Sequence, residues 1–315
     1  MADTDTHFFI KSTPDMEGER IDKALSELLP EYTRSSIQAW IKQQKVLIDN
    51  TIVNQKYRLK NKEVIEIHIP PAKEVQLQAE NIKLEIVYED EHVIVINKPS
   101  GLVVHPGAGN QSATLMNGLL YHDAQLRQLP RAGIVHRLDK DTTGLMVVAK
   151  NEAARQGLIS QLESRQMNRQ YLAITNGVMI SGETIDQPIG RHHVNRLKMA
   201  VTKNGKPAVT HIRVLQKFDS HCLLQANLET GRTHQIRVHL AWRGFPLVGD
   251  PLYGKRLHLP ASCSEPLSLC LRNFNRQALH AQKIDFLHPY SQEPISFTVD
   301  ADQDMQKLLA LLGAD

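Results

Sequence analysis

Residues 130–150 read PRAGIVHRLDKDTTGLMVVAK, and this stretch decides how the rest of the chain is interpreted. Apolar residues cluster on either side of it, at residues 134–135 and 145–148, which predicts two buried strands. Between them lies the polar loop HRLDKDTTG. Its central carboxylate, Asp139, has cationic neighbours, and nearby cations favour the ionised form of a carboxylate. The stretch therefore predicts a sheet that carries a polar loop, with Asp139 as a candidate nucleophile or base.

The string HRLDKDTTGL resembles the HRLDxxTSGL signature of the RluA family of RNA pseudouridine synthases. It departs from that signature at Thr143, where the family often has serine, and both residues supply a hydroxyl group. The resemblance implies an enzyme that isomerises uridine to pseudouridine, with Asp139 as the catalytic residue. The wider stretch implies large-subunit (23S) ribosomal RNA as the substrate. The isomerisation consumes no electrons and no energy source, so no cofactor is expected.

The composition is that of a globular chain of one large domain or two smaller ones. It has 315 residues, 41% of them hydrophobic, and a net charge of only +3, so an RNA-binding role has to reside in local basic patches. The three cysteines, Cys222, Cys263 and Cys270, form no CxxC pair, which argues against a disulfide framework or a metal site and favours the cytoplasm. Neither a signal segment nor a membrane span is expected from the sequence.

The first 70 residues contain a compact helix–helix–strand pattern. Helical spacing runs from Arg20 until Pro30, a second helix is expected after a cap at Thr33, and strands are expected at residues 45–49 and 64–69. The strings RIDKALSELL and TRSSIQAWIKQQKVLID are similar to the alpha-L RNA-binding domain first described in ribosomal protein S-four.

Local charge supports the same interpretation, although a solvated basic face on an accessory domain is the alternative. Between residues 32 and 62 the single acid Asp49 stands against seven cations, and such a face suits phosphates. The residues expected to bind RNA here are Arg34, Lys42, Lys45, Lys56, Arg58 and Lys60.

These patterns predict an α+β chain of two domains. Residues 17–75 would form the RNA-binding domain and residues 76–83 a polar linker. Residues 84–315 would form the pseudouridine synthase catalytic domain, with a long mixed, mainly antiparallel sheet flanked by helices and loops. Residues 260–276 are irregular and are expected to form a surface loop, before a last helix over residues 301–312.

Two further catalytic candidates come from the resemblance. Tyr171 in RQYLAI matches the family's tyrosine, which stacks on the target base and is a candidate proton acceptor. The string GRTHQIRVH matches the motif whose second arginine, here Arg237, pairs with the catalytic aspartate. A helix is expected from His234 to about Gly244 with Thr233 as its N-cap. Taken alone, Tyr171 would be interpreted as core and Arg237 as helix surface.

Arg137 and a second basic stretch complete the candidate site. Arg137 follows His136 in the loop, and its planar cation could stack in the gap left by an extracted base. Residues 191–208 contain five cations and no acid, which predicts another phosphate-binding surface. The RNA-binding candidates in this half of the chain are Arg191, Arg196, Lys198 and Arg232.

Three alternatives remain open at this stage. The chain could be a non-catalytic RNA-binding protein of ribosome assembly, or a paralogous synthase acting on other ribosomal or transfer RNA uridines. A hydrolytic nucleosidase would need a second carboxylate, and Asp141 is the near neighbour, expected to point away from Asp139. A monomer is expected, with the assembling large subunit as a possible partner.

Overall fold

The computed structural model describes residues 6–29, 32, 34–69, 78–107, 109–254, 257, 259–260 and 263–314. The chain divides into two compact units, with the division between residues 76 and 77. Within the described residues, every helix is too short or too polar to cross a lipid bilayer. The expected helix end at Pro30 and the expected cap at Thr33 lie outside the described residues.

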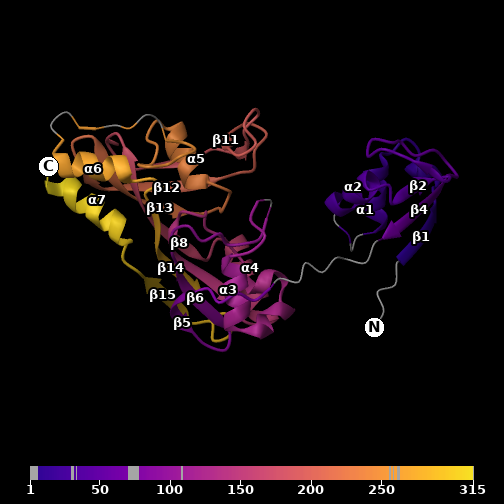
Figure 1. The fold of residues 1–315 in the computed structure, drawn as a ribbon, viewed down its shortest axis with the longest axis horizontal. Helices are drawn as coiled ribbons and strands as arrows, with labels where there is room; N and C mark the ends of the chain where they lie inside the picture. Colours follow the sequence, from indigo (N-terminus) through magenta and orange to yellow (C-terminus); the bar gives the residue numbers. More distant parts are fainter. Residues whose placement is uncertain are drawn as a thin grey trace. The chain divides into compact units, whose positions relative to one another are not determined.

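The first unit packs two helices on a small sheet (Figure 1). Helices α1 (Ile21–Leu28) and α2 (Arg34–Lys42) follow a short 3-10 turn, η1 (Pro14–Met16). The sheet has the strand order β1-β4-β2-β3, made of β1 (Thr6–Lys11), β4 (Val64–Ile69), β2 (Val46–Ile48) and β3 (Thr51–Ile52). The core contains Ile37, Trp40 and Ile41, the side chains expected on the buried stripe of α2.

The second unit is built on a nine-stranded sheet. Its order is β5-β6-β7-β14-β8-β13-β12-β9, and β15 pairs with β14. The strands are β5 (Glu85–Glu89), β6 (Val93–Lys98), β7 (Thr143–Ala149), β8 (Asn168–Asn176), β9 (Glu183–Asp186), β12 (Val209–Lys217), β13 (His221–Leu228), β14 (Leu279–Leu287) and β15 (Pro294–Thr298). The β14–β7 pair is parallel and the other pairs are antiparallel, which confirms the mixed, mainly antiparallel sheet.

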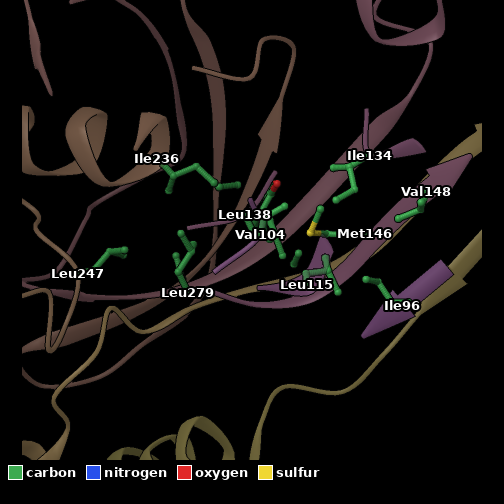
Figure 2. Packing of buried hydrophobic residues seen from close by; sticks show 14 of the residues in the cluster. Ile96, Val104, Leu115, Ile134, Leu138, Met146, Val148, Ile236, Leu247 and Leu279 are labelled. Atoms are coloured by element: carbon green, nitrogen blue, oxygen red, sulfur yellow. The ribbon is translucent and has the colours of Figure 1, made fainter. Parts of the chain in front are cut away.

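Strand β7 lies in the middle of this sheet, and all seven of its residues are buried. Met146 and Val148 pack into one core with residues of α3 (Leu115–His122) and α5 (Gln235–Trp242), as Figure 2 shows for part of that cluster. Leu145 and Val147 pack into a second core with α4 (Glu152–Glu163). Alternate residues of a strand point to opposite faces, so both faces of β7 are covered.

The expected strand at residues 134–135 is not present. Residues 130–133 form the 3-10 turn η3 (Pro130–Gly133), which follows η2 (Ala124–Gln128), and Ile134 makes only an isolated bridge to Val148. Arg131 and Ala132 have φ of 56° and 51°, and such left-handed backbone interrupts a strand. The loop is therefore entered from a tight turn and leaves into β7.

Two other segments differ from, or add to, the expectations. Helix α6 (Glu265–Asn273) lies within residues 260–276, which we expected to form an irregular loop, and it packs with α7 (Gln303–Ala314) in one apolar cluster. Leu267 and Leu271 supply its buried face. Residues 78–84 have no helix or strand, yet Gln78 and Glu80 hydrogen-bond to Asn117 of α3.

Candidate active site

A buried cation, Lys98, holds the loop that carries Asp139 through hydrogen bonds. Its side chain is 1% exposed, and Nζ donates hydrogen bonds to the carbonyl oxygens of Pro99 (2.8 Å), Leu102 (3.0 Å) and Lys140 (2.8 Å). Burial lowers the pKa of Lys98 to about 8, against the opposing effect of nearby carboxylates. Because Lys140 follows Asp139 in the chain, this bond fixes the backbone next to the reactive carboxylate.

The far side of the loop is tied to β14 and the residues before it. Gln277 Nε2 donates to Thr142 Oγ1 at 3.0 Å, and Thr143 Oγ1 lies 2.8 Å from His280 Nδ1. Gly144 has φ of +104°, and a Cβ added there would lie 2.2 Å from the Ala281 carbonyl oxygen. Only glycine allows this approach of β7 to β14, so the loop ends at a fixed point.

Asp139 is paired with Arg237, as predicted. Arg237 Nη1 donates to Asp139 Oδ2 at 2.8 Å, and 98 residues separate the two in sequence. The rest of the guanidinium is held by Asp250, with Nε to Oδ2 at 2.8 Å and Nη2 to Oδ1 at 2.9 Å. A bidentate arginine–carboxylate pair fixes orientation as well as charge. Arg237 therefore presents one remaining edge to Asp139.

The electrostatics of this triplet keep the guanidinium charged despite its burial. Burial lowers the pKa of Arg237, but the hydrogen bond and charge of Asp250, followed by those of Asp139, outweigh it and raise the pKa above its usual value. Burial likewise raises the pKa of Asp250, and the contacts with Arg237 together with the N–H groups of Tyr253 and Leu252 outweigh it, so that pKa is lowered.

Helix α5, which carries Arg237, begins differently from the prediction. Its N-cap is His234, in left-handed conformation with φ of 57°, and not Thr233. Gln235 fixes the turn that precedes the helix, because its Oε1 accepts hydrogen bonds from Thr230 Oγ1 (2.8 Å) and the Arg232 N–H (2.9 Å). The left-handed turn places the His234 ring beside the site, with Nε2 3.8 Å from Asp139 Oδ1.

Tyr253 joins several of these parts. Its hydroxyl lies 2.8 Å from His234 Nδ1 and accepts a 2.8 Å hydrogen bond from the Met199 N–H. The Arg237 guanidinium carbon lies 5.1 Å from the centre of the Tyr253 ring. Met199 belongs to the two-stranded hairpin of β10 (Ile189–Arg191) and β11 (Met199–Val201), so Tyr253 connects that hairpin with the Arg237 site.

A pocket of about 340 Å³ opens beside Asp139. Its lining includes Asp139, Arg237 and Tyr171, so the structure brings the three predicted residues to one cavity. Drug-sized ligands occupy pockets of about 300–1,000 Å³, so this pocket lies within the range of small-molecule sites. Apolar side chains complete the lining, among them Ile134, Leu138, Leu228, Ile236 and Leu279.

Tyr171 lies in the pocket wall and is 5% exposed. Burial raises the pKa of Tyr171, the positive charge of Arg169 opposes the rise, and the negative charge of Asp139 adds to it. The phenol is therefore neutral at neutral pH, with an aromatic face suited to stacking on a base.

Arg137 and Asp141 lie on different sides of this arrangement. Arg137 is exposed and lines the pocket. Asp141 is absent from the residues that line the pocket, and its carbonyl oxygen accepts a hydrogen bond from Arg276 at 3.3 Å. The described pocket therefore presents Asp139 as its carboxylate, without the second one that a hydrolase needs.

Sequence reasoning missed several residues of the site. Asp250 and Tyr253 lie in LVGDPLYG, a string that resembles a turn, and Arg169 lies two residues before Tyr171 on β8, hence on the same strand face. That i, i+2 spacing is a signal that could have found Arg169. Asp250 gave no comparable signal, because its partner Arg237 is identified only by the folded chain.

The cations of the first unit lie on its surface. Lys42, Lys45, Lys56, Arg58 and Lys60 are exposed, and Lys42 and Lys56 line a groove together with Gln44, Asn54 and Gln55. Arg34 donates to the buried carboxylate of Asp22 at 3.0 Å with its side chain 46% exposed. Arg34 therefore contributes to the unit's internal contacts as well as to its charge.

The predicted cations of the second unit lie around the hairpin and the pocket. Arg191 and Arg196 are exposed and Lys198 is partly exposed, with its Nζ 5.9 Å from the centre of the Tyr253 ring. Arg232 lines the pocket and donates from Nε to the Pro207 carbonyl oxygen at 3.0 Å. Of the four, Arg232 lines the pocket and Lys198 lies near Tyr253, whereas Arg191 and Arg196 are exposed residues of the hairpin.

Comparison with known proteins identifies the family of this chain. Residues 92–242 match the model of the RNA pseudouridylate synthase family, and residues 19–65 match the S4 domain. A protein of Xanthomonas campestris named ribosomal large subunit pseudouridine synthase D (RluD) is 48% identical over 298 residues, covering 95% of this chain and 90% of that protein. The chain belongs to the RNA pseudouridine synthase family. It is an isomerase, and the predicted family is confirmed.

Other relatives support this conclusion. The Haemophilus influenzae protein of the same name is 48% identical, covering 96% of this chain and 94% of that protein. Human RNA pseudouridylate synthase domain containing 4 has a solved structure that is 28% identical, with a TM-score of 0.57, 73% of this chain covered and 93% of that chain. The similarity to RluD, predicted from residues 130–150, is confirmed at the level of these relatives.

Proposed function

We propose that this chain isomerises uridines of large-subunit (23S) ribosomal RNA to pseudouridine, with Asp139 starting the reaction. The observation that carries the proposal is the Asp139–Arg237 pair, 2.8 Å long, at a pocket that also holds Tyr171. The target class is inferred from the relatives, which are named for the ribosomal large subunit. The compartment that follows from this substrate is the cytoplasm.

The chemistry assigns one task to each group. Asp139 attacks C1′ or removes a sugar proton, and in both routes it must be ionised and oriented, which its bond to Arg237 favours. The uracil is released, turned and rejoined to C1′ through C5. Tyr171 supplies a stacking face and, because its phenol is neutral, holds the neighbouring water that receives the C5 proton. Arg137 stacks in the gap left by the extracted base.

Two basic surfaces hold the RNA in this proposal. The cations of residues 17–75 bind backbone phosphates outside the site, and residues 76–83 connect that domain to the catalytic domain of residues 84–315. Arg191, Arg196, Lys198 and Arg232 bind phosphates near the target uridine. The enzyme acts as a monomer, on free RNA or on the assembling large subunit.

The test uses a 23S transcript labelled with tritium at uridine C5. Wild type releases the label, and Asp139→Asn releases none, while the RNA chain stays intact and free uracil is absent. Asp219→Asn changes an exposed turn carboxylate in the same way and is the matched control, with release equal to wild type. Binding without release by the wild type would contradict the proposal in favour of a non-catalytic binder, and free uracil would indicate a hydrolase. Release from small-subunit or transfer RNA alone would indicate a paralogous specificity.

A further inference from the structure

Arg169 is a buried cation in the pocket wall that the mechanism above does not use. Its exposed fraction is 8%, and it lines the pocket beside Tyr171. Its Nε has no hydrogen-bond partner among the described residues, and the ion pairs between those residues do not include it. An unpaired buried charge is costly, by about 3 kcal/mol or more when its partner is removed. A folded chain that keeps one in its active site has a functional reason to do so.

The position of Arg169 directs its charge into the pocket. It is two residues from Tyr171 on β8, so both side chains leave the same face of the sheet. Its positive charge acts on two other residues of the pocket lining: it opposes the rise in the pKa of Tyr171 and adds to the burial that lowers the pKa of His136 to about 3. A Cβ added at Gly231 would lie 2.9 Å from Arg169 Nη1, so the loop at Gly231 lies directly against the guanidinium.

The reaction creates an anion at this place. When the N1–C1′ bond breaks, its electron pair stays on the uracil and spreads over N1, O2 and O4. C1′ then either bonds to the Asp139 carboxylate or is left in a double bond as Asp139 takes the C2′ proton. The C5 atom of the same anion then forms the new bond to C1′. In the first route the C1′–O bond to Asp139 breaks as it does so, and in the second Asp139 returns the proton to C2′. The C5 proton departs last. The anion exists only between these steps, so a fixed cation stabilises it more than it stabilises bound uridine.

We propose that Arg169 is a catalytic residue that stabilises the detached uracil anion through a hydrogen-bonded contact with its carbonyl oxygens. This inference rests on the proposed function of the pocket. Asp139 is the wrong charge for this task, and the Arg237 guanidinium is already engaged by two carboxylates. Arg169 lines the same cavity, and the ion pairs between the described residues leave its guanidinium without a carboxylate partner.

The experiment compares two RNAs whose detached uracil anions differ in their stability without the enzyme. Fluorine at C5 withdraws electrons and stabilises a uracil anion without the enzyme. We expect Arg169→Gln to slow single-turnover conversion of uridine RNA by about 100-fold, the scale of losing one preorganised donor to a developing anion. With 5-fluorouridine RNA the loss should be at least about tenfold smaller, following the same reasoning. The rearranged nucleoside is measured by chromatography after nuclease digestion, because C5 carries no proton in that substrate.

Three comparisons make the result decisive. Arg165→Gln removes an exposed arginine four residues earlier on the chain and should convert both RNAs at the wild-type rate. Arg169→Lys keeps the charge and should lose less activity than Arg169→Gln. Its loss should again be larger on uridine RNA than on 5-fluorouridine RNA. It replaces the glutamine variant in the test if that variant does not fold. Arg169→Gln should unfold at a temperature equal to or above that of wild type, because a residue needed only for packing would lower it.

Several outcomes would overturn the proposal while wild type remains active. Equal losses on the two RNAs would show that Arg169 does not stabilise the leaving anion. In an Asp139→Asn background, RNA affinity should be unaffected by Arg169→Gln. A lower affinity with a salt slope reduced by about one would instead make Arg169 a phosphate contact. If wild type itself converts neither RNA, the proposed function fails. That result is distinguishable from equal losses on the two RNAs and from a lowered RNA affinity.

Discussion

Asp250 grips the Arg237 guanidinium with two hydrogen bonds, of 2.8 and 2.9 Å, and leaves one edge of it for Asp139. Asp250 is itself fixed by accepting from the N–H groups of Leu252 and Tyr253 at 2.9 and 3.0 Å. The orientation of Asp139 therefore depends on a second carboxylate, which is closed to solvent and has no route to the substrate except through Arg237.

We expect Asp250→Asn to lower both stability and activity. Loss of one partner of a buried ion pair costs about 3–5 kcal/mol, so the free energy of unfolding should fall by about that amount. Tritium release should fall by about 100-fold, because a freed guanidinium misplaces Asp139. Urea denaturation and single-turnover release measure the two effects. Glu152→Gln breaks a surface pair with Arg155 and should leave both the free energy of unfolding and the activity close to wild type. Normal activity in Asp250→Asn would show that Arg237 orients Asp139 alone.

The two roles of Tyr171 can be separated by removing its hydroxyl. Tyr171→Phe keeps the ring, so RNA affinity should stay at the wild-type level. C5 tritium release should fall by about 10²–10⁴-fold, because the hydroxyl that holds the proton-accepting water is lost. Tyr171→Leu should also weaken RNA affinity, since stacking contributes about 1–3 kcal/mol per base. Affinity is measured by filter binding in the Asp139→Asn background. Full tritium release by Tyr171→Phe would restrict Tyr171 to stacking.

The first unit should act through phosphates. Lys56→Glu combined with Lys60→Glu removes two exposed cations, so RNA affinity and the steepness of its salt dependence should both fall. Conversion of a minimal stem-loop, if the enzyme accepts one, should be unaffected. Lys217→Glu with Lys307→Glu makes the same charge change at exposed positions of the second unit and should leave the salt slope unaltered. An unchanged slope in the first variant would remove the RNA role of this unit.

The lowered pKa of Lys98 should make the free energy of unfolding depend on pH. Its pKa is about 8 in the folded chain and 10.5 as the ordinary value, so between these values the unfolded chain binds more protons. The contribution of Lys98 to the free energy of unfolding therefore rises with pH, by about 2 kcal/mol between pH 8 and pH 10. Lys98→Met lacks the effect. Between pH 8 and pH 10 the free energy of unfolding of wild type should therefore rise by about 2 kcal/mol more than that of the variant. Urea denaturation at both pH values measures the difference. Parallel pH curves would contradict the assignment.

Much of this site could be read from the sequence because its parts fall in short, distinctive strings. Asp139, Tyr171 and Arg237 each sit in such a string, and folding brings the three to one pocket. Asp250 and Lys98 could not be identified that way. Their partners are an arginine 13 residues away and a carbonyl oxygen 42 residues away, and neither spacing has a pattern.

The local errors have physical causes. Residues 134–135 are as apolar as a strand, but the three left-handed residues at Arg131, Ala132 and Gly133 turn the chain before one can form. Helix α6 was missed because polar residues surround it, although Ser264 and the proline in its first turn are helix-start signals. Thr233 has the hydroxyl of a cap, but the chain adopts a left-handed turn at His234 and begins the helix after it.

The enclosure of β7 between two apolar cores constrains how enzymes with this fold can diverge. A shift of one residue along that strand would exchange its two faces and displace the loop that carries Asp139, so the register of β7 cannot change without loss of the site. The loop between β10 and β11 carries no such constraint, since residues 193–197 are all exposed. New RNA targets can therefore arise by altering outlying loops while the chemistry passes unchanged from ancestor to descendant.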